Sequence, residues 1–136
     1  MQEPTESKIL SLRQAVVNGN VAQVQTLILQ GVDIDDTEGS NYGSPLNAAA
    51  RNGHMEIVKL LLDAGANIDF RNDDIGATPL MMAVDSGQLE AAALLIERGA
   101  DLNITNVDGA NALMYAQGTR VDVRDKIIRL LQKGRS

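Results

Sequence analysis

The sequence has 136 residues, of which 44% are hydrophobic and 22% charged, so it is long enough to form one packed domain. Its formal net charge of −6 disfavours nucleic-acid binding, which draws most of its affinity from clustered lysines and arginines. The absence of cysteine excludes disulfides and thiolate metal sites, and no apolar run approaches the ~18 residues of a membrane span. We therefore expect a soluble, cytoplasmic protein that binds neither nucleic acid nor membrane.

Taken in chain order, residues 1–6 are polar and include Pro4, which indicates a loose N-terminal tail. A first helix is expected to begin near Ser7 and to end at Asn18, because its apolar residues recur at helical spacing. A second helix follows Gly19 and ends at Gly31. Two short antiparallel helices joined by a glycine turn therefore form one structural unit.

The second unit carries clearer boundary signals. Ser44 is suited to cap a helix by accepting a hydrogen bond from a backbone amide, and Pro45 follows at the first helical position, where its missing amide costs nothing. Gly53 is expected to end this helix in a left-handed conformation. The partner helix is expected over residues 54–64, with Gly65 as its stop.

The third and fourth units repeat this arrangement. Thr78 precedes a proline, Gly87 ends the first helix of the third unit, and a second helix is expected over residues 89–98. In the fourth unit Asn111 is the expected cap. The spacing of this unit departs from the others, which predicts two extra residues between its helices, around residues 118–123.

Corresponding residues of the first three units lie 34 positions apart without gaps, which indicates a repeated supersecondary unit. Five sets share this phase: Gly19, Gly53 and Gly87; Gly31, Gly65 and Gly99; Leu27, Leu61 and Leu95; Leu12, Leu46 and Leu80; and Ala15, Ala49 and Ala83. We predict a single domain over residues 7–134, with repeats at about 7–36, 37–72, 73–106 and 107–134. Such units are stabilised by stacking on their neighbours.

Two segments, SPLNAAARNGHMEIVKLLLDAGANID at 44–69 and TPLMMAVDSGQLEAAALLIERGADLN at 78–103, resemble ankyrin repeats. The resemblance is weaker in the first and last units, which would serve as caps. It implies an all-α solenoid of stacked antiparallel helix pairs with projecting hairpin-like loops. The family usually places histidine after Thr-Pro-Leu, whereas the corresponding residues here are Arg13, Asn47, Met81 and Met114, so we expect altered loop geometry.

Residues suited to catalysis or metal binding are sparse. The single histidine, His54, has no evident convergent partners, and the resemblance places it at the start of an outer helix, which favours a structural role. The pairs Asp35-Asp36 and Asp73-Asp74 match a calcium loop only in part. There is no phosphate-binding glycine loop and no activated serine motif. We expect no enzyme activity, no cofactor and no metal.

The connections between the units are acidic. Between Gly31 and Asn111 they hold nine of the eighteen acidic residues and one basic residue, Arg71. Four of these acids stand where the family usually forms hydrogen bonds within the turn: Asp33, Asp35, Asp69 and Asp101. The remaining five are equally consistent with steering of a basic partner and with solubility: Asp36, Glu38, Asp73, Asp74 and Asp108.

The resemblance also implies where a partner would bind, namely at the loop tips and the concave face of the inner helices. Carried onto this sequence, it selects Asn41, Tyr42, Arg51, Asn52, Asp74, Ile75, Ala77, Met82, Asp85, Ser86, Val107, Asp108 and Tyr115. Of the adjacent methionines 81 and 82, the second is the better candidate for the surface. Tyr42, Ile75, Met82 and Tyr115 would be apolar anchors, and Arg51 and Asp85 would supply polar specificity. Each position is equally consistent with an ordinary surface residue.

An extended array without a reactive cluster predicts a non-catalytic protein–protein interaction module. We expect a small adaptor or a regulatory or inhibitory subunit, monomeric when free, whose partner carries a basic patch. The alternative is a structural scaffold, or a repeat segment of a larger protein, without its own ligand. An enzyme would instead require a pocket of convergent polar groups.

Overall fold

The computed structural model describes residues 8–37, 40 and 43–134, so the expected tail at residues 1–6 lies outside the described residues. The described part contains eight helices and no strand, which confirms the all-α prediction. In chain order they are α1 (Lys8–Asn18), α2 (Val21–Leu29), α3 (Pro45–Asn52), α4 (Met55–Asp63), α5 (Pro79–Asp85), α6 (Leu89–Glu97), α7 (Ala112–Gln117) and α8 (Val121–Gly134).

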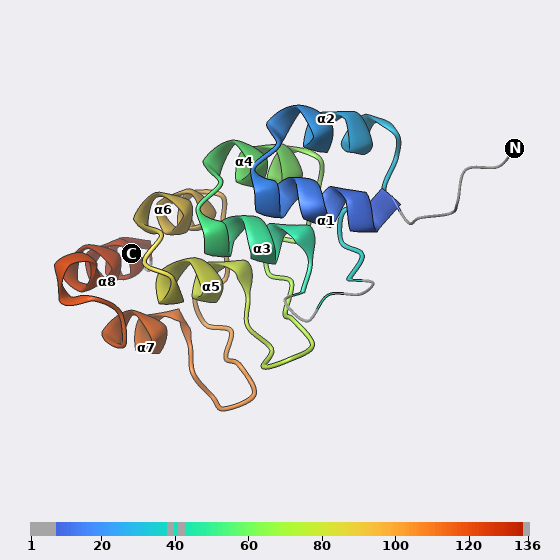
Figure 1. The fold of residues 1–136 in the computed structure, drawn as a ribbon. Helices are drawn as coiled ribbons and strands as arrows, with labels where there is room; N and C mark the ends of the chain where they lie inside the picture. The colour runs from blue at the N-terminus through green and yellow to red at the C-terminus, as the bar shows by residue number, and fades with distance from the viewer. Residues whose placement is uncertain (1–7, 38–39, 41–42, 135–136) are drawn as a thin grey trace, which may run out of the picture.

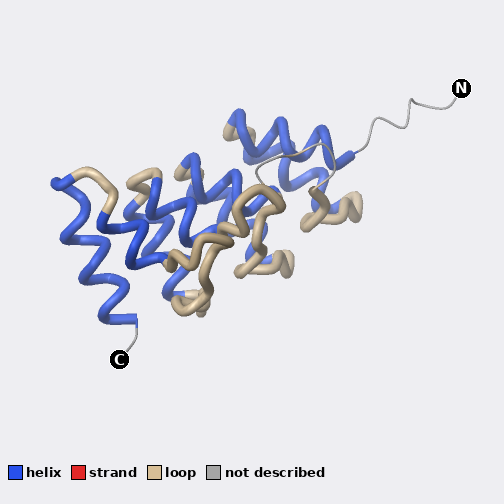
Figure 2. The backbone as a smooth tube through the Cα atoms, turned by 90° about the horizontal axis from the view of Figure 1, so that it is seen from below, coloured by secondary structure: helices blue, strands red, loops and turns tan. Residues whose placement is uncertain are grey.

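The helices form two layers that run the length of the molecule (Figure 1). The odd-numbered helices pack side by side in the order α1, α3, α5, α7, and the even-numbered helices form the outer row α2, α4, α6, α8. Loops that connect one helix pair to the next project beyond the inner row (Figure 1) and lie in front of the helices when the molecule is seen from below (Figure 2). This is the stacked solenoid with projecting loops that the sequence predicts.

The inner helices begin with the expected caps. The Ser44 hydroxyl accepts a hydrogen bond from the Asn47 amide at 3.4 Å, and the Thr78 hydroxyl accepts one from the Met81 amide at 3.2 Å. A proline occupies the first turn of α3 and of α5. Gly53 ends α3 with φ of 70°, a conformation that a side chain would strain. These predicted boundaries of the second and third units are confirmed.

The hydrophobic core lies between the two layers and follows the 34-residue repeat. Leu12, Leu46 and Leu80 hold the same place in successive inner helices, and at most 1% of each is exposed. Leu61 and Leu95 are completely buried in the outer row. Because isolated helices of 6 to 11 residues, such as α1 to α7, barely form in water, this burial between neighbours is what stabilises them.

The fourth unit differs from the prediction. The residues between α7 and α8 are Gly118, Thr119 and Arg120, a connection as short as that between α5 and α6. The additional residues lie within α8, which has 14 residues against nine in α6. The expected longer connection is wrong because Val123 and Ile127 continue one apolar stripe of helical period along α8.

Carboxylates of two connections fasten one repeat to the next. Asp35 accepts a hydrogen bond from the Asn67 amide at 3.0 Å, and Asp69 accepts one from the Asp101 amide at 2.9 Å. The expectation that these two acids bond within their own turns is therefore wrong. Their partners lie 32 residues further along the chain, where the stacked repeat brings an equivalent backbone amide close. Asp33 does bond within its turn, to the amide of Asp35.

His54 also joins adjacent repeats. Its Nε2 lies 3.2 Å from the carbonyl oxygen of Val17, near the end of α1. Gln88 holds the equivalent place in the next repeat and donates a hydrogen bond from Nε2 to the carbonyl of Arg51 at 3.3 Å. The last carbonyl groups of a helix have no hydrogen-bond partner within the helix. The side chains of His54 and Gln88 supply partners for these carbonyls, which would otherwise bond to water. This geometry supports a structural role for His54.

Asn47 replaces the family's usual histidine and is completely buried. Its side-chain oxygen accepts hydrogen bonds from the amide of Ser44 at 2.9 Å and from the hydroxyl of the same residue at 2.7 Å. Its Nδ2 donates to the carbonyls of Phe70 at 3.1 Å and Ala77 at 3.3 Å, both in the loop between α4 and α5. One amide thus connects the start of α3 to the loop beside it.

We predict that Asn47→Ala lowers the free energy of unfolding by about 2 to 4 kcal/mol, because it leaves buried backbone groups without partners. Urea denaturation followed by circular dichroism measures this loss. Asn52→Ala, at an exposed residue of the same helix, is the matched control and should change stability by less than about 0.5 kcal/mol. Equal effects of the two substitutions would contradict the role assigned to Asn47.

Candidate functional site

A hollow of about 220 Å³ lies where the inner helices meet the projecting loops. Its walls come from three successive repeats and from both helices and loops. The lining residues are Arg51 from the end of α3, Asn72, Asp74, Ile75 and Ala77 from the following loop, Met82, Asp85 and Ser86 from α5 and its end, and Tyr115 from α7. No single repeat could form this hollow, because its lining depends on the stacking.

The loop wall is held by Asn72, which is 7% exposed. The Asn72 side-chain oxygen accepts hydrogen bonds from the amides of Ile75 at 3.0 Å and Ala77 at 3.1 Å. The Asn72 backbone amide donates to the Ala77 carbonyl at 2.9 Å. This closed turn fixes Asp74 and Ile75 at its tip, so that the half-buried Ile75 side chain lies in the wall of the hollow.

The opposite wall is held in an equivalent way by the next loop. Asn106 accepts hydrogen bonds from the amides of Asp108 and Ala110, each at 2.9 Å. Its Nδ2 donates to the Tyr115 hydroxyl at 2.7 Å, which fixes the phenol ring at the edge of the hollow. The Val107 amide donates to the Ile75 carbonyl at 2.9 Å, so the two loops are joined directly.

The chemistry of the hollow is mixed. Ile75 and Tyr115 present apolar surface that is partly exposed, while Arg51, Asp74 and Asp85 are exposed around them. One cation and two carboxylates beside an apolar floor suit the recognition of another polypeptide, in which charged groups surround an apolar anchor. Among the described residues there is no group of three or more histidines or acids placed to hold a metal ion.

The structure gathers most of the residues that the sequence selects. Eight of them line the hollow: Arg51, Asp74, Ile75, Ala77, Met82, Asp85, Ser86 and Tyr115. Asn52 is exposed at the end of α3 but outside the hollow, and Val107 and Asp108 lie on the adjoining loop, where 66% of Val107 is exposed. Asn41 and Tyr42 lie outside the described residues.

Two of the eight contribute less surface than expected. Met82 is only 9% exposed, so its assignment to the surface is wrong for most of its side chain. Its sulfur packs against the Asn72 amide nitrogen at 4.0 Å, because the loop folds over that face of α5. Ala77 is 2% exposed, and its backbone forms hydrogen bonds with Asn72 that close the turn in the wall of the hollow.

Asn72 is the lining residue that sequence reasoning missed. A signal for it exists, because Asn72 and Asn106 lie 34 residues apart, in the same phase as the leucines and glycines of the repeat. An asparagine recurring at one place in a polar connection indicates a side chain that closes a turn by bonding its backbone.

Comparison with known families agrees with the geometry. The family profile described as ankyrin repeats, in three copies, matches residues 12–106, which is more than half of the chain. The chain therefore belongs to the ankyrin repeat family. Ankyrin repeats are generally protein–protein interaction modules and are typically non-catalytic. A comparison with curated proteins gave no match. Within the described residues no helix has both the length and the apolar character needed to cross a membrane.

We predict that Asn72→Ala loosens the wall of the hollow without unfolding the array. Loss of its two accepted hydrogen bonds should lower the free energy of unfolding by about 1 to 3 kcal/mol. Hydrogen exchange at the amides of Ile75 and Ala77 should accelerate at least about tenfold. Asp73→Ala, one residue further along the same loop, is the control. Unchanged exchange in Asn72→Ala would contradict the assignment.

Proposed function

We propose that this protein is a small adaptor or a regulatory or inhibitory subunit, which binds another protein through the hollow and the neighbouring loop tips. The observation that carries the proposal is the convergence of Ile75, Tyr115, Arg51 and Asp85 from three repeats on one hollow. Binding energy in protein interfaces is concentrated in a few central residues, with aromatic side chains and arginine prominent among them. Tyr115 and Arg51 are of these types.

The rigidity of the walls supports the same proposal. Tyr115 is held by Asn106, and Ile75 lies in a turn closed by Asn72. Side chains fixed before binding lose little conformational freedom when a partner arrives, and this raises affinity. The partner would insert an apolar side chain against Ile75 and Tyr115 and pair polar groups with Arg51 and Asp85.

The partner is proposed to carry a basic patch. Asp73, Asp74 and Asp108 are exposed on the loops beside the hollow, and Asp35 and Asp69 are occupied in contacts between repeats. Acidic side chains clustered beside a binding site accelerate association with a basic surface and make the association rate sensitive to salt. We place the protein in the cytoplasm as a monomer when free.

The test is affinity capture of partners from a lysate of the native cell, followed by mass spectrometry. We predict that Asp74→Lys combined with Ile75→Ser weakens binding of a captured partner at least about tenfold, because it removes an anchor and reverses a charge. Binding by the unaltered protein should also weaken as salt is raised from about 0.05 to 0.3 M.

The matched control is Glu56→Lys, which makes the same charge change at an exposed residue of the outer helix α4 and should bind normally. Retention of the partner by the double variant would show that the hollow is not the binding site. A chain that captures no partner under any condition would favour the alternative of a scaffold without its own ligand.

A further inference from the structure

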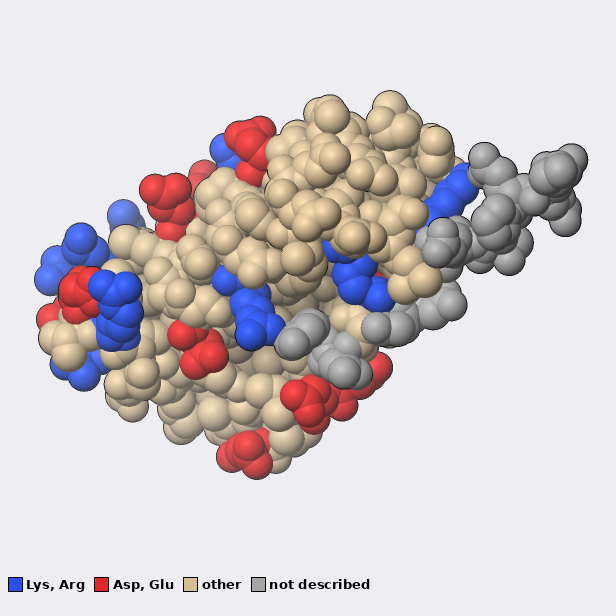
Figure 3. Space-filling model, in the orientation of Figure 1, with Lys and Arg blue, Asp and Glu red and all other residues tan. Residues whose placement is uncertain are grey.

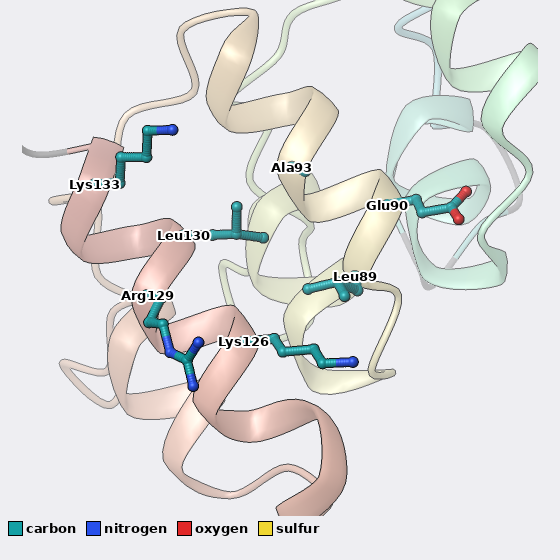
Figure 4. A pocket seen from close by; sticks show the side chains of 7 residues that line it. All are labelled: Leu89, Glu90, Ala93, Lys126, Arg129, Leu130 and Lys133. Carbon is teal, nitrogen blue, oxygen red and sulfur yellow. The ribbon is translucent and has the colours of Figure 1, made fainter.

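A second concave surface lies on the outer layer, between α6 and α8, and its chemistry differs from that of the hollow. It is a groove of about 470 Å³ lined by Leu89, Glu90 and Ala93 of α6 and by Lys126, Arg129, Leu130 and Lys133 of α8. Leu130 projects across the groove toward α6, and Leu89 lies near one end of the groove (Figure 4). The floor is thus apolar, with cationic side chains beside it.

Ala93 keeps the α6 side of this groove low, because its side chain is a single methyl group. Ala93 stands 34 positions after Lys59 and 68 after Gln25, so the first two repeats carry a long polar side chain at the place where α6 carries a methyl group. A long side chain there would project over the seam between adjacent outer helices. With alanine, the apolar surface of Leu89 and Leu130 stays open.

Basic residues are concentrated in the C-terminal part of the chain, whereas acidic residues are most frequent in the connections between the repeats. Residues 120–136 contain six of the twelve basic residues but only two of the eighteen acidic residues. Blue side chains gather at the α8 end of the molecule, whereas red side chains are spread over the projecting loops, the edge of the outer row and, in smaller number, the α8 end (Figure 3). A protein with a net charge of −6 therefore has one strongly basic end.

Two of the cations at the groove are available to an incoming ligand. Lys126 and Arg129 are exposed, and neither forms a salt bridge with another described residue. The single acid of the groove, Glu90, points its carboxylate away from α8 (Figure 4). The lining of the groove therefore carries more basic than acidic side chains.

We propose that the groove binds an acidic amphipathic helix of a partner protein, laid between α6 and α8. Such a helix would place apolar residues, spaced three and four apart, on Leu89, Ala93 and Leu130, and its carboxylates beside Lys126 and Arg129. The lining residues of α8, from Lys126 to Lys133, span about 11 Å, which matches about two turns of a bound helix.

Other occupants fit less well. A second copy fits less well, because its helices that carry two exposed acidic residues, α4, α6 and α8, already bury their apolar faces in the core. The apolar lining consists only of Leu89, Ala93 and Leu130, which suits one face of a helix and is a small patch for insertion into a bilayer. This site is separate from the hollow, which lies on the inner row and carries more acid than base.

The probe is a fluorescein-labelled synthetic peptide of about 15 residues, made of Leu, Glu and Ala and designed with an apolar stripe and an acidic face. We predict saturable binding by fluorescence anisotropy. Lys126→Glu combined with Arg129→Glu should weaken binding about tenfold, because two attractive contacts become repulsive. Ala93→Gln, which restores the side chain of the first repeat, should weaken it to a similar degree by covering the floor.

Lys59→Glu on α4 is the matched control and should bind within about twofold of the unaltered protein. A peptide of the same composition without an apolar face, and one with lysine for glutamate, should bind at least about tenfold more weakly. Circular dichroism verifies folding, and if Ala93→Gln fails to fold, the charge variant decides.

Three outcomes would overturn the proposal. The first is equal binding of the designed and permuted peptides. The second is unchanged affinity in the charge variant. The third is that vesicles of anionic phospholipid, or a second copy of this chain detected by sedimentation, bind at this groove more tightly than the peptide.

Discussion

The structure depends on the stacking of helix pairs that are too short to be stable alone. Each pair has an apolar face, and that face is removed from water only when another pair covers it. The leucines at 12, 46 and 80 are the clearest expression of this constraint, since each is almost completely buried at the same place in its own repeat. The hollow and the groove are consequently shared between repeats, because the stacking that buries the leucines also brings neighbouring surfaces together.

Buried asparagines fix the conformation of the loops between the stacked helix pairs by hydrogen-bonding to the loop backbone. Asn47 joins the start of α3 to the loop beside it, while Asn72 and Asn106 each close a turn at the hollow. An amide supplies both an acceptor and two donors, so a single side chain can satisfy backbone groups of opposite kind in a place that water does not reach. The same groups that remove the cost of burying the loop backbone also fix Ile75 and Tyr115 in the walls.

The two concave surfaces differ in sign and in position. The hollow on the inner row is bordered by acidic loops, and the groove on the outer row is bordered by the cations of α8. If both proposed sites bind, two polypeptides of opposite charge would contact the protein without overlap. Electrostatic complementarity of this kind discriminates between partners as much as it strengthens binding.

The sequence alone determined the repeat, the helix boundaries of the second and third units and most residues of the hollow. These follow from local rules, namely the 34-residue phase, the caps at Ser44 and Thr78 and the apolar stripes. The tertiary structure decided what depends on distant neighbours: the burial of Met82 beneath a loop, the contact of Asp35 with the amide of Asn67, and the groove between α6 and α8. A residue's exposure and its hydrogen-bond partner are set by whatever packs against it, and in a stacked array that neighbour lies a whole repeat away in the sequence.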